Sequence, residues 1–213
     1  MKKNSTKDIV TQIKNPDLVE QRRNQIVDAS IKLFFKNGFH KTTTRQIAKE
    51  SGFSIGSLYE YISSKEDILF LVCDSIHGEV EQSVNEILAL KKGTRESLAE
   101  MISEYFMICD KMSTHVLLMY QESKSLPIKY RSKIIDTEAR IKDVFVKALT
   151  QTVKKKRLSK GDKKKLELIG HNIAVLGHMW SFRRWSLAKN YSIQEYIKLQ
   201  TDFLLGEADL LFS

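Results

Sequence analysis

Residues that break helices are scarce in this sequence. It contains two prolines and nine glycines among 213 residues, so little in it forces the backbone out of a helix or into a left-handed turn. This composition favours long helices over many short strands. Hydrophobic residues make up 42% of the chain, which is enough for a core in one large or two small domains. We therefore expect an all-α protein.

Sites for disulfides, metals and membranes are also missing. Cys73 and Cys109 lie in apolar helical patterns, without a CxxC motif or a histidine at metal-binding spacing, which indicates buried free thiols in a reducing compartment. No apolar run approaches the length of a membrane span, and the first ten residues lack the apolar core of a signal peptide. We expect a cytoplasmic protein with no metal site, no cofactor and no membrane partner.

Motifs typical of enzymes are absent as well. The sequence has no HExxH, no GxSxG and no glycine-rich phosphate loop. Its five histidines are scattered, and His171 and His178, seven residues apart on one helix face, have no carboxylate beside them. Core histidines are the simpler interpretation of that pair. We predict no catalytic residue and no enzymatic activity.

The stretch Thr43–Lys65 has the pattern of a helix-turn-helix. Thr43 is a suitable N-cap, and Gln46, three residues later, completes a capping box. Gly52 supplies the positive φ that ends the first helix, and Ser54 begins a second helix with the sequence IGSLYEYI. The start of a third helix follows at the end of the stretch.

The second of these helices has two different faces. Leu58 and Ile62, four residues apart, are expected to pack inward, which leaves Ile55, Gly56 and Tyr59 on the outer face. Small and aromatic residues on an outer face allow a helix to approach base edges closely. This is how a recognition helix enters the major groove of DNA.

Positive charge is concentrated in two places. Residues 1–65 carry twelve Lys and Arg against six Asp and Glu, and residues 152–165 carry eight against one. The first excess coincides with the helix-turn-helix, where contact with DNA phosphates explains it. The second has two interpretations, a solvated loop or a site for an anionic group such as the phosphates of coenzyme A.

The order of the predicted elements suggests three parts. Residues 1–15 form a flexible basic arm, residues 16–64 a three-helix DNA-binding domain, and residues 65–213 a larger helical domain. A capping box at Ser64 and Asp67 opens a long helix that joins the two domains. About nine helices are expected in all. The last two, over 162–189 and 192–211, are unusually apolar, so we expect them to form a homodimer interface.

Residues 38–69, GFHKTTTRQIAKESGFSIGSLYEYISSKEDIL, resemble the N-terminal signature of the TetR family of bacterial transcriptional regulators. Two positions depart from the family pattern, Ser51 in place of alanine and Ile62 in place of phenylalanine. Both suit a packed helix. The resemblance implies an all-α homodimer with a small DNA-binding domain and a larger effector-binding domain. It also implies that the protein represses transcription and that a small molecule relieves this repression.

The resemblance further implies which residues contact a double-stranded, pseudo-palindromic operator. Base edges would face Arg45, Ile55, Gly56 and Tyr59. The alternative for Arg45 is an exposed side chain that does not contact DNA. The alternative for Tyr59 and Tyr61 is packing within the three-helix domain. Phosphates would be held by Thr43, Thr44, Ser57, Tyr61 and Lys65.

Side chains for an effector are expected in the larger domain, which is rich in methionine and aromatic residues. Such an interior suits an apolar ligand, although core packing or a dimer seam is the alternative for each residue. Because some members of the family respond to acyl-CoA, an acyl-CoA or fatty acid is the effector we expect. A ligand-independent, architectural DNA-binding protein is the alternative function, and the large apolar domain argues against it. The candidate effector residues are Tyr105, Phe106, Met119, Tyr120, Phe145, His178 and Trp185.

Overall fold

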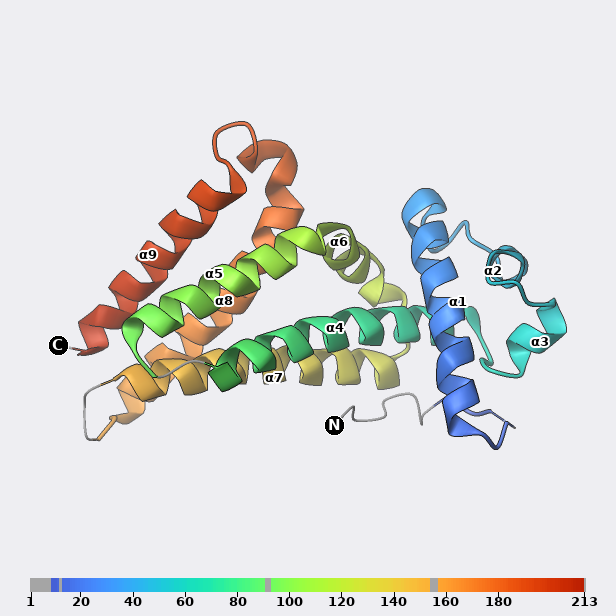
Figure 1. Ribbon diagram of the computed structural model, residues 1–213, viewed down its shortest axis with the longest axis horizontal. Helices are drawn as coiled ribbons and strands as arrows, with labels where there is room; N and C mark the ends of the chain where they lie inside the picture. The colour runs from blue at the N-terminus through green and yellow to red at the C-terminus, as the bar shows by residue number, and fades with distance from the viewer. Residues whose placement is uncertain (1–8, 12, 91–92, 154–156, 213) are drawn as a thin grey trace. The chain divides into compact units, whose positions relative to one another are not determined.

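A computed structural model describes residues 9–11, 13–90, 93–153 and 157–212. Over these residues the chain is helical and has no strand, which confirms the expected all-α class (Figure 1). None of the described helices combines the length and apolar character that crossing a membrane requires. In chain order the helices are α1 (Pro16–Asn37), α2 (Thr44–Glu50), α3 (Ile55–Tyr59), α4 (Lys65–Leu90), α5 (Arg95–Lys111), α6 (Ser113–Glu122), the 3-10 helix η2 (Ser123–Ser125), α7 (Ile128–Thr152), α8 (Lys160–Leu187) and α9 (Ile193–Phe212).

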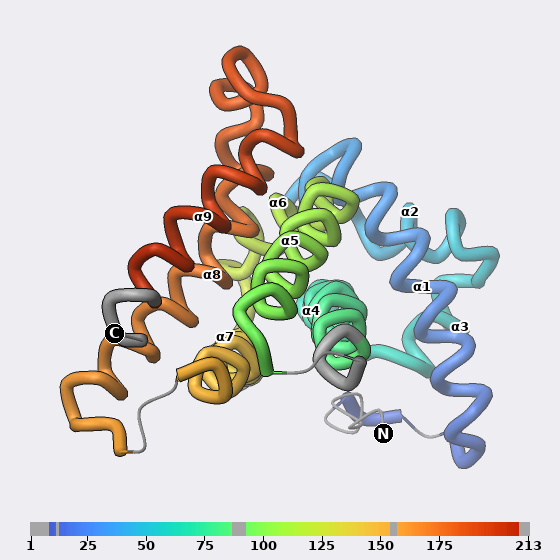
Figure 2. The backbone as a smooth tube through the Cα atoms, turned by 60° about the vertical axis from the view of Figure 1, so that its left-hand side comes forward, coloured from blue at the N-terminus to red at the C-terminus, as the bar shows by residue number. Residues whose placement is uncertain are grey.

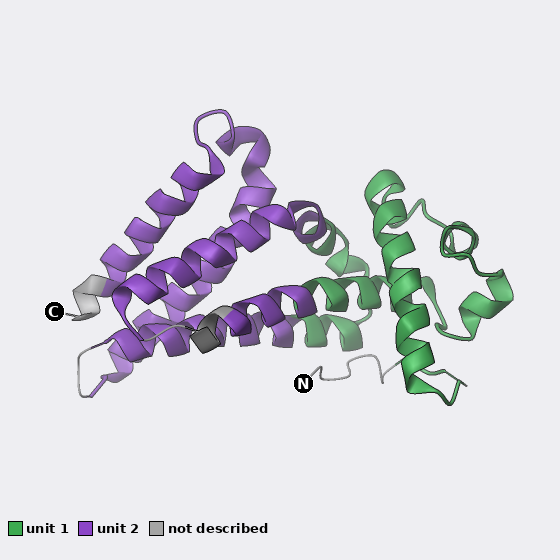
Figure 3. Ribbon diagram, viewed as in Figure 1, with its two compact units in different colours: residues 1–77, 118–134 green, residues 78–117, 135–213 purple. Residues whose placement is uncertain are grey.

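The chain divides into two compact units, which Figure 3 shows in different colours. Unit 1 takes residues 1–77 and 118–134, and unit 2 takes residues 78–117 and 135–213. Three helices, α4, α6 and α7, therefore contribute residues to both units. The functional division at residue 65 stays a prediction.

Unit 1 contains the three N-terminal helices. The side chain of Asn15 caps α1 by accepting hydrogen bonds from the next helical N–H groups, and Pro16 occupies the first turn, as the sequence predicts. The helix ends at Gly38, whose φ of 78° is left-handed. Ile26 and Phe34 are buried on its inner face, and α1 packs on α2.

The described part of the N-terminal arm is anchored to unit 1. Ile9 is buried, and its carbonyl oxygen accepts a hydrogen bond from Arg23 Nη2 at 2.8 Å. Thr11 Oγ1 donates to the carbonyl oxygen of Glu60 at 2.8 Å. Two residues of the arm predicted over residues 1–15 therefore have contacts in unit 1, Ile9 through the buried Arg23 and Thr11 through Glu60. Flexibility of the arm as a whole stays a prediction. Residues 1–8 and 12 lie outside the described residues.

Unit 2 is built around α5, α8 and α9, which contact one another pairwise. Figure 2 shows α8 and α9 running antiparallel beside each other. A close approach of α5 to α8 depends on Gly177, since a Cβ there would lie 2.5 Å from Tyr105 Cε1. Side chains from these helices, α4 and α7 form one apolar core, which includes Ile102, Phe145 and Leu204.

Two element boundaries differ from the prediction. The helix expected from Asp162 begins at Lys160, because Ser159 caps it and Asp162 completes the capping box at the third helical position. The helix expected over IGSLYEYI ends at Tyr59. There the backbone tightens, with Tyr61 N donating to the Leu58 carbonyl oxygen at 3.1 Å. Of the basic run, residues 154–156 lie outside the described residues.

Candidate nucleic-acid interface

The helix-turn-helix forms through the local interactions that its sequence predicts. Thr43 Oγ1 accepts from Gln46 N at 3.3 Å, and Gln46 Oε1 accepts from Thr43 N at 2.8 Å, which is a complete capping box for α2. Gly52 has a φ of 77°. Ser54 then caps α3 by accepting from Ser57 N at 3.0 Å.

The outer face of α3 presents apolar and aromatic side chains to solvent. Ile55 is 41% exposed and Tyr59 is 49% exposed, and Gly56 between them is also exposed. Leu58 on the opposite face is fully buried. The Tyr59 hydroxyl lies 3.3 Å from Thr44 Oγ1, so α2 and α3 together orient this ring. The expected contacts of these residues with DNA stay a prediction.

Other predicted contact residues flank this face. Arg45 and Thr43 are exposed at the start of α2, while Ser57 is half-buried and its hydroxyl forms a hydrogen bond with the Ser54 hydroxyl at 3.0 Å. A basic side chain and two hydroxyls at helix N-termini are the groups that usually hold phosphates and fix the register on DNA. These residues therefore remain candidates.

Tyr61 does not lie where the resemblance implied. Its side chain is only 6% exposed, and its ring meets Phe53 edge-on with the centroids 5.8 Å apart. The packing alternative therefore describes Tyr61, and a phosphate contact does not. Its backbone also has a structural partner, because the Tyr61 carbonyl oxygen accepts from Arg23 Nε at 3.0 Å.

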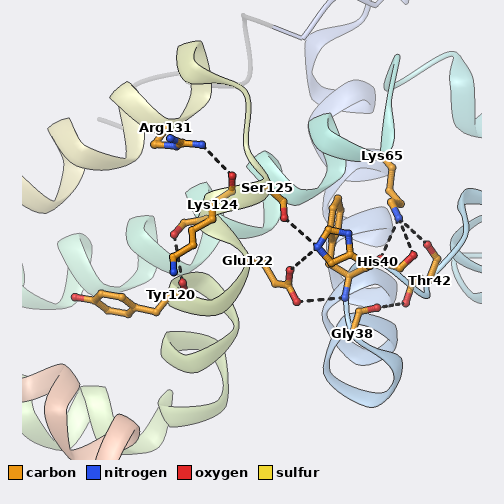
Figure 4. Close-up of polar contacts among 11 residues, drawn as sticks. Gly38, His40, Thr42, Lys65, Tyr120, Glu122, Lys124, Ser125 and Arg131 are labelled. Carbon is orange, nitrogen blue, oxygen red and sulfur yellow. Dashed lines mark hydrogen bonds and ion pairs between the residues drawn. The ribbon is translucent and has the colours of Figure 1, made fainter.

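Lys65 also differs from the expectation. Its ammonium group donates to the carbonyl oxygens of Phe39 at 3.0 Å, His40 at 3.3 Å and Thr42 at 3.1 Å (Figure 4). An ammonium group has three protons, so all three find acceptors within the protein. Lys65 thus holds the connection between α1 and α2 in place, and its ammonium group is not extended towards a DNA phosphate.

The same connection meets the end of α6 (Figure 4). Glu122 Oε1 accepts from Phe39 N at 3.5 Å, and Glu122 Oε2 lies 3.9 Å from His40 Nε2. The hydroxyl of Ser125 in η2 lies 3.3 Å from the same imidazole nitrogen. Residues 39–40 are therefore held by α4 and by the α6 end within unit 1.

Four of the predicted effector residues cluster in unit 2. The ring of Tyr105 lies 6.0 Å from that of Phe106, 5.0 Å from that of Phe145 and 6.1 Å from that of His178. The Tyr105 hydroxyl donates to the Ala174 carbonyl oxygen at 3.0 Å and lies 3.1 Å from His178 Nε2. The result is an aromatic cluster that contains a tyrosine–histidine polar pair.

The other three predicted effector residues are placed differently. Met119 and Tyr120 belong to unit 1, where Met119 is buried and Tyr120 half-buried. Trp185 is 68% exposed, with the Arg183 guanidinium 5.0 Å from its ring centroid. An exposed indole does not line an interior site, so the expectation for Trp185 is wrong. Trp180, on another face of α8, is the buried tryptophan, and its Nε1 donates to Asp110 Oδ1 at 2.7 Å.

Comparison with known proteins agrees with this architecture. The model of the tetR family of bacterial regulatory proteins matches residues 26–72. The regulator HbdR of Aromatoleum sp. (strain CIB), an HTH-type transcriptional regulator, is 30% identical over 196 residues, which cover 91% of this chain and 82% of HbdR. The chain belongs to the TetR family.

Two further similar proteins have a fatty acid or an acyl-CoA in their descriptions. The fatty acid metabolism regulator protein of Bacillus subtilis (strain 168) is 26% identical over 137 residues, covering 64% of this chain and 71% of that protein. A crystal structure of FadR from Bacillus subtilis in complex with stearoyl-CoA shares the fold, with a TM-score of 0.64 and 22% identity, and covers 89% of this chain and 97% of that chain. The family match and the similarity to HbdR show that the chain is a transcriptional regulator of the TetR family.

Some residues that shape this TetR-family DNA-binding unit escaped sequence reasoning. Arg23 is 3% exposed and bonds to both Ile9 and Tyr61; burial lowers its pKa, and the charge of Asp67 opposes that shift. Its spacing from Val19 and Ile26 placed it on the buried face of α1, which was the available signal. Tyr130 had a similar signal, because it lies four residues from both Leu126 and Ile134, which are buried.

Proposed function

We propose that this protein is a repressor that binds a pseudo-palindromic operator in the cytoplasm and leaves it when an acyl-type effector binds. The observation that carries the DNA-binding part is the exposed face of α3, with Ile55, Gly56 and Tyr59. Apolar and aromatic side chains next to a small residue allow close contact with base edges and thymine methyl groups. The positive charge of residues 1–65 supplies phosphate affinity.

A homodimer through α8 and α9 is part of the proposal. Leu199 and Phe203 are 55% and 61% exposed, and Gly206 continues the same face of α9. On α8, Leu168 is exposed as well. Large apolar side chains in a stripe are unfavourable in water and mark an interface. A second copy of the chain would cover them and would give the operator its two-fold symmetry.

The effector proposal rests on the interior of unit 2 and on the relatives. Tyr105, Phe106 and Phe145 are fully buried, and the Tyr105 hydroxyl lies 3.1 Å from Nε2 of the buried His178. Such a set suits a long apolar chain with one polar anchor. Support also comes from the fatty acid metabolism regulator and from the neighbour bound to stearoyl-CoA. A long-chain acyl-CoA or fatty acid is therefore the proposed effector class.

Selection of DNA from a random pool tests the operator proposal. The purified protein should enrich a palindromic sequence, because a two-fold symmetric dimer reads two equivalent half-sites. Binding without any enriched palindrome would favour the alternative, an architectural protein that binds DNA with little sequence preference.

Thermal-shift measurements test the effector. Stearoyl-CoA and free fatty acids of several chain lengths should raise the melting temperature, since a ligand that binds the folded state stabilises it by mass action, and should release the selected operator. Coenzyme A alone is the control for the headgroup. If no acyl-CoA or fatty acid shifts the transition, this effector class is wrong.

A further inference from the structure

The DNA-binding helices share unit 1 with a segment that is distant in sequence. Residues 118–134, here called the α6–α7 segment, belong to the same compact unit as α1, α2 and α3. The segment is braced internally, because Arg131 Nη2 donates to the carbonyl oxygens of Lys124 at 2.9 Å and Leu126 at 3.1 Å (Figure 4). It therefore offers a fixed surface to the helix-turn-helix.

One contact of this segment reaches the carboxylate of Asp67 in the first turn of α4. The Tyr130 hydroxyl donates to Asp67 Oδ1 at 2.5 Å. Asp67 Oδ2 accepts from the backbone N–H groups of Ser63 at 2.8 Å and Ser64 at 3.0 Å. Asp67 is buried, so each of its oxygens has a protein donor in place of water. This carboxylate is consequently held both by α7 and by the residues that precede α4.

Tyr130 itself has a well-defined place. Its side chain is 1% exposed, and its ring stacks on that of Phe70 at 4.2 Å between centroids with an interplanar angle of 8°. Burial and the hydrogen bond to Asp67 both raise the pKa of Tyr130, so the phenol remains a donor over the physiological pH range. Because the ring is fixed by stacking and its hydroxyl binds one carboxylate, the position of Tyr130 determines the position of the Asp67 side chain through that hydrogen bond.

The residues that Asp67 holds follow the recognition helix directly. The helix α3 ends at Tyr59, and residues 60–64 connect it to α4. Two groups fix this connection from opposite ends: Arg23 binds the carbonyl oxygen of Tyr61, and Asp67 binds the N–H groups of Ser63 and Ser64. The direction in which α3 points thus depends on both anchors.

We propose that Tyr130 is a positioning residue for DNA recognition, which acts through Asp67 on the connection that follows α3. It does not contact DNA. Specific binding requires α3 to meet base edges at a defined angle, whereas binding to random DNA depends on phosphate charge. Loss of the Tyr130 hydroxyl therefore weakens sequence discrimination and leaves the affinity for random DNA in place. This inference rests on the proposed binding of an operator.

The test compares the full-length wild type with Tyr130→Phe, which keeps the ring on Phe70 and removes only the hydroxyl. The Kd for the selected operator should rise about tenfold, the size expected from losing one hydrogen bond to a charged group. The Kd for a scrambled duplex of equal length should change less than about twofold. Tyr191→Phe is the matched control, because Tyr191 is an exposed tyrosine in unit 2.

Two further measurements separate positioning from general loss of structure. Amide hydrogen exchange at Ser63 and Ser64 should accelerate about tenfold in Tyr130→Phe, as their acceptor becomes less fixed. In the Asp67→Ala background, Tyr130→Phe should change the operator Kd less than about twofold, because the Tyr130 hydroxyl then has no Asp67 carboxylate to bind. Helical circular dichroism verifies that each variant is folded.

An unchanged operator Kd in Tyr130→Phe overturns the inference, and so does an equal loss on operator and scrambled DNA. A wild type that enriches no palindrome contradicts the proposed function instead. In that case the exchange rates at Ser63 and Ser64 still decide whether Tyr130 holds the connection after α3.

Discussion

The ammonium nitrogen of Lys65 lies 4.3 Å from the centroid of the Phe39 ring and 3.0 Å from the Phe39 carbonyl oxygen. Lys65 is the first residue of α4, and Phe39 begins the connection between α1 and α2. A cation–π attraction and a hydrogen bond to a backbone carbonyl therefore act between the same two residues. The first residue of α4 thus holds the connection between α1 and α2 in place.

Lys65→Met should lower the free energy of unfolding by about 1–3 kcal/mol, because three carbonyl oxygens lose a charged donor. Urea unfolding measures this, with Lys147→Met as a control at an exposed position of α7. The salt dependence of binding to random DNA should stay as in the wild type. Unchanged stability with a salt slope reduced by about one unit would instead show that Lys65 binds phosphate.

Tyr59→Ala should weaken binding to the selected operator by about 1–3 kcal/mol and relax the preference at one operator position. The reason is its exposed ring on the outer face of α3, oriented by Thr44. Fluorescence anisotropy on operator variants measures both effects, with Tyr191→Ala as the control. Equal losses on operator and random DNA would contradict the assigned role.

Gly177→Ala should destabilise unit 2 by about 1–3 kcal/mol through overpacking. The added Cβ would lie 2.5 Å from Tyr105 Cε1 and 3.2 Å from Cys109 Sγ. Gly78→Ala, at an exposed position of α4 with nothing within 4 Å, should gain about 0.5–1 kcal/mol because alanine is the better helix former. Thermal unfolding measures the pair. Identical signs for the two changes would contradict the close packing of α5 on α8.

Phe203→Lys should convert the proposed dimer to a monomer, since it places a charge in the exposed apolar stripe of α9. Light scattering coupled to size exclusion measures the mass. Met107→Lys, at an exposed methionine of α5, is the control and should leave the mass unchanged. A Phe203→Lys protein that keeps its oligomeric mass would place the interface elsewhere.

The two thiols should resist modification in the folded protein. Burial raises the pKa of Cys109 to about 12, and burial with nearby negative charges raises the pKa of Cys73 to about 12. At pH 8 a thiol reagent should react with both only after urea is added. Because these pKa values are raised from 9.0, the thiols' contribution to stability is complete below pH 9 and is lost as the pH rises towards 12. Stability that increases over this range would contradict burial of the thiols.

Local interactions explain why so much of the DNA-binding unit follows from the sequence. The capping box of Thr43 and Gln46, the left-handed Gly52 and the cap at Ser54 join residues within a few positions of each other. Such interactions form in almost any tertiary context. Local sequence therefore predicts the helix caps, the turn and the outer face of α3, although not the residue at which α3 ends.

Residues whose partners are distant in sequence take their roles from the folded chain. Lys65 meets carbonyl oxygens 23–26 residues away, and Tyr130 meets Asp67 63 residues away. The exposure of Trp185, predicted to line an interior site, has the same origin: Trp180 and Trp185 point about 140° apart around α8, and packing selects the face of Trp180 for burial. The type of an apolar or charged side chain does not by itself identify its partner. The fold brings the acceptor within hydrogen-bond distance and removes the competing water.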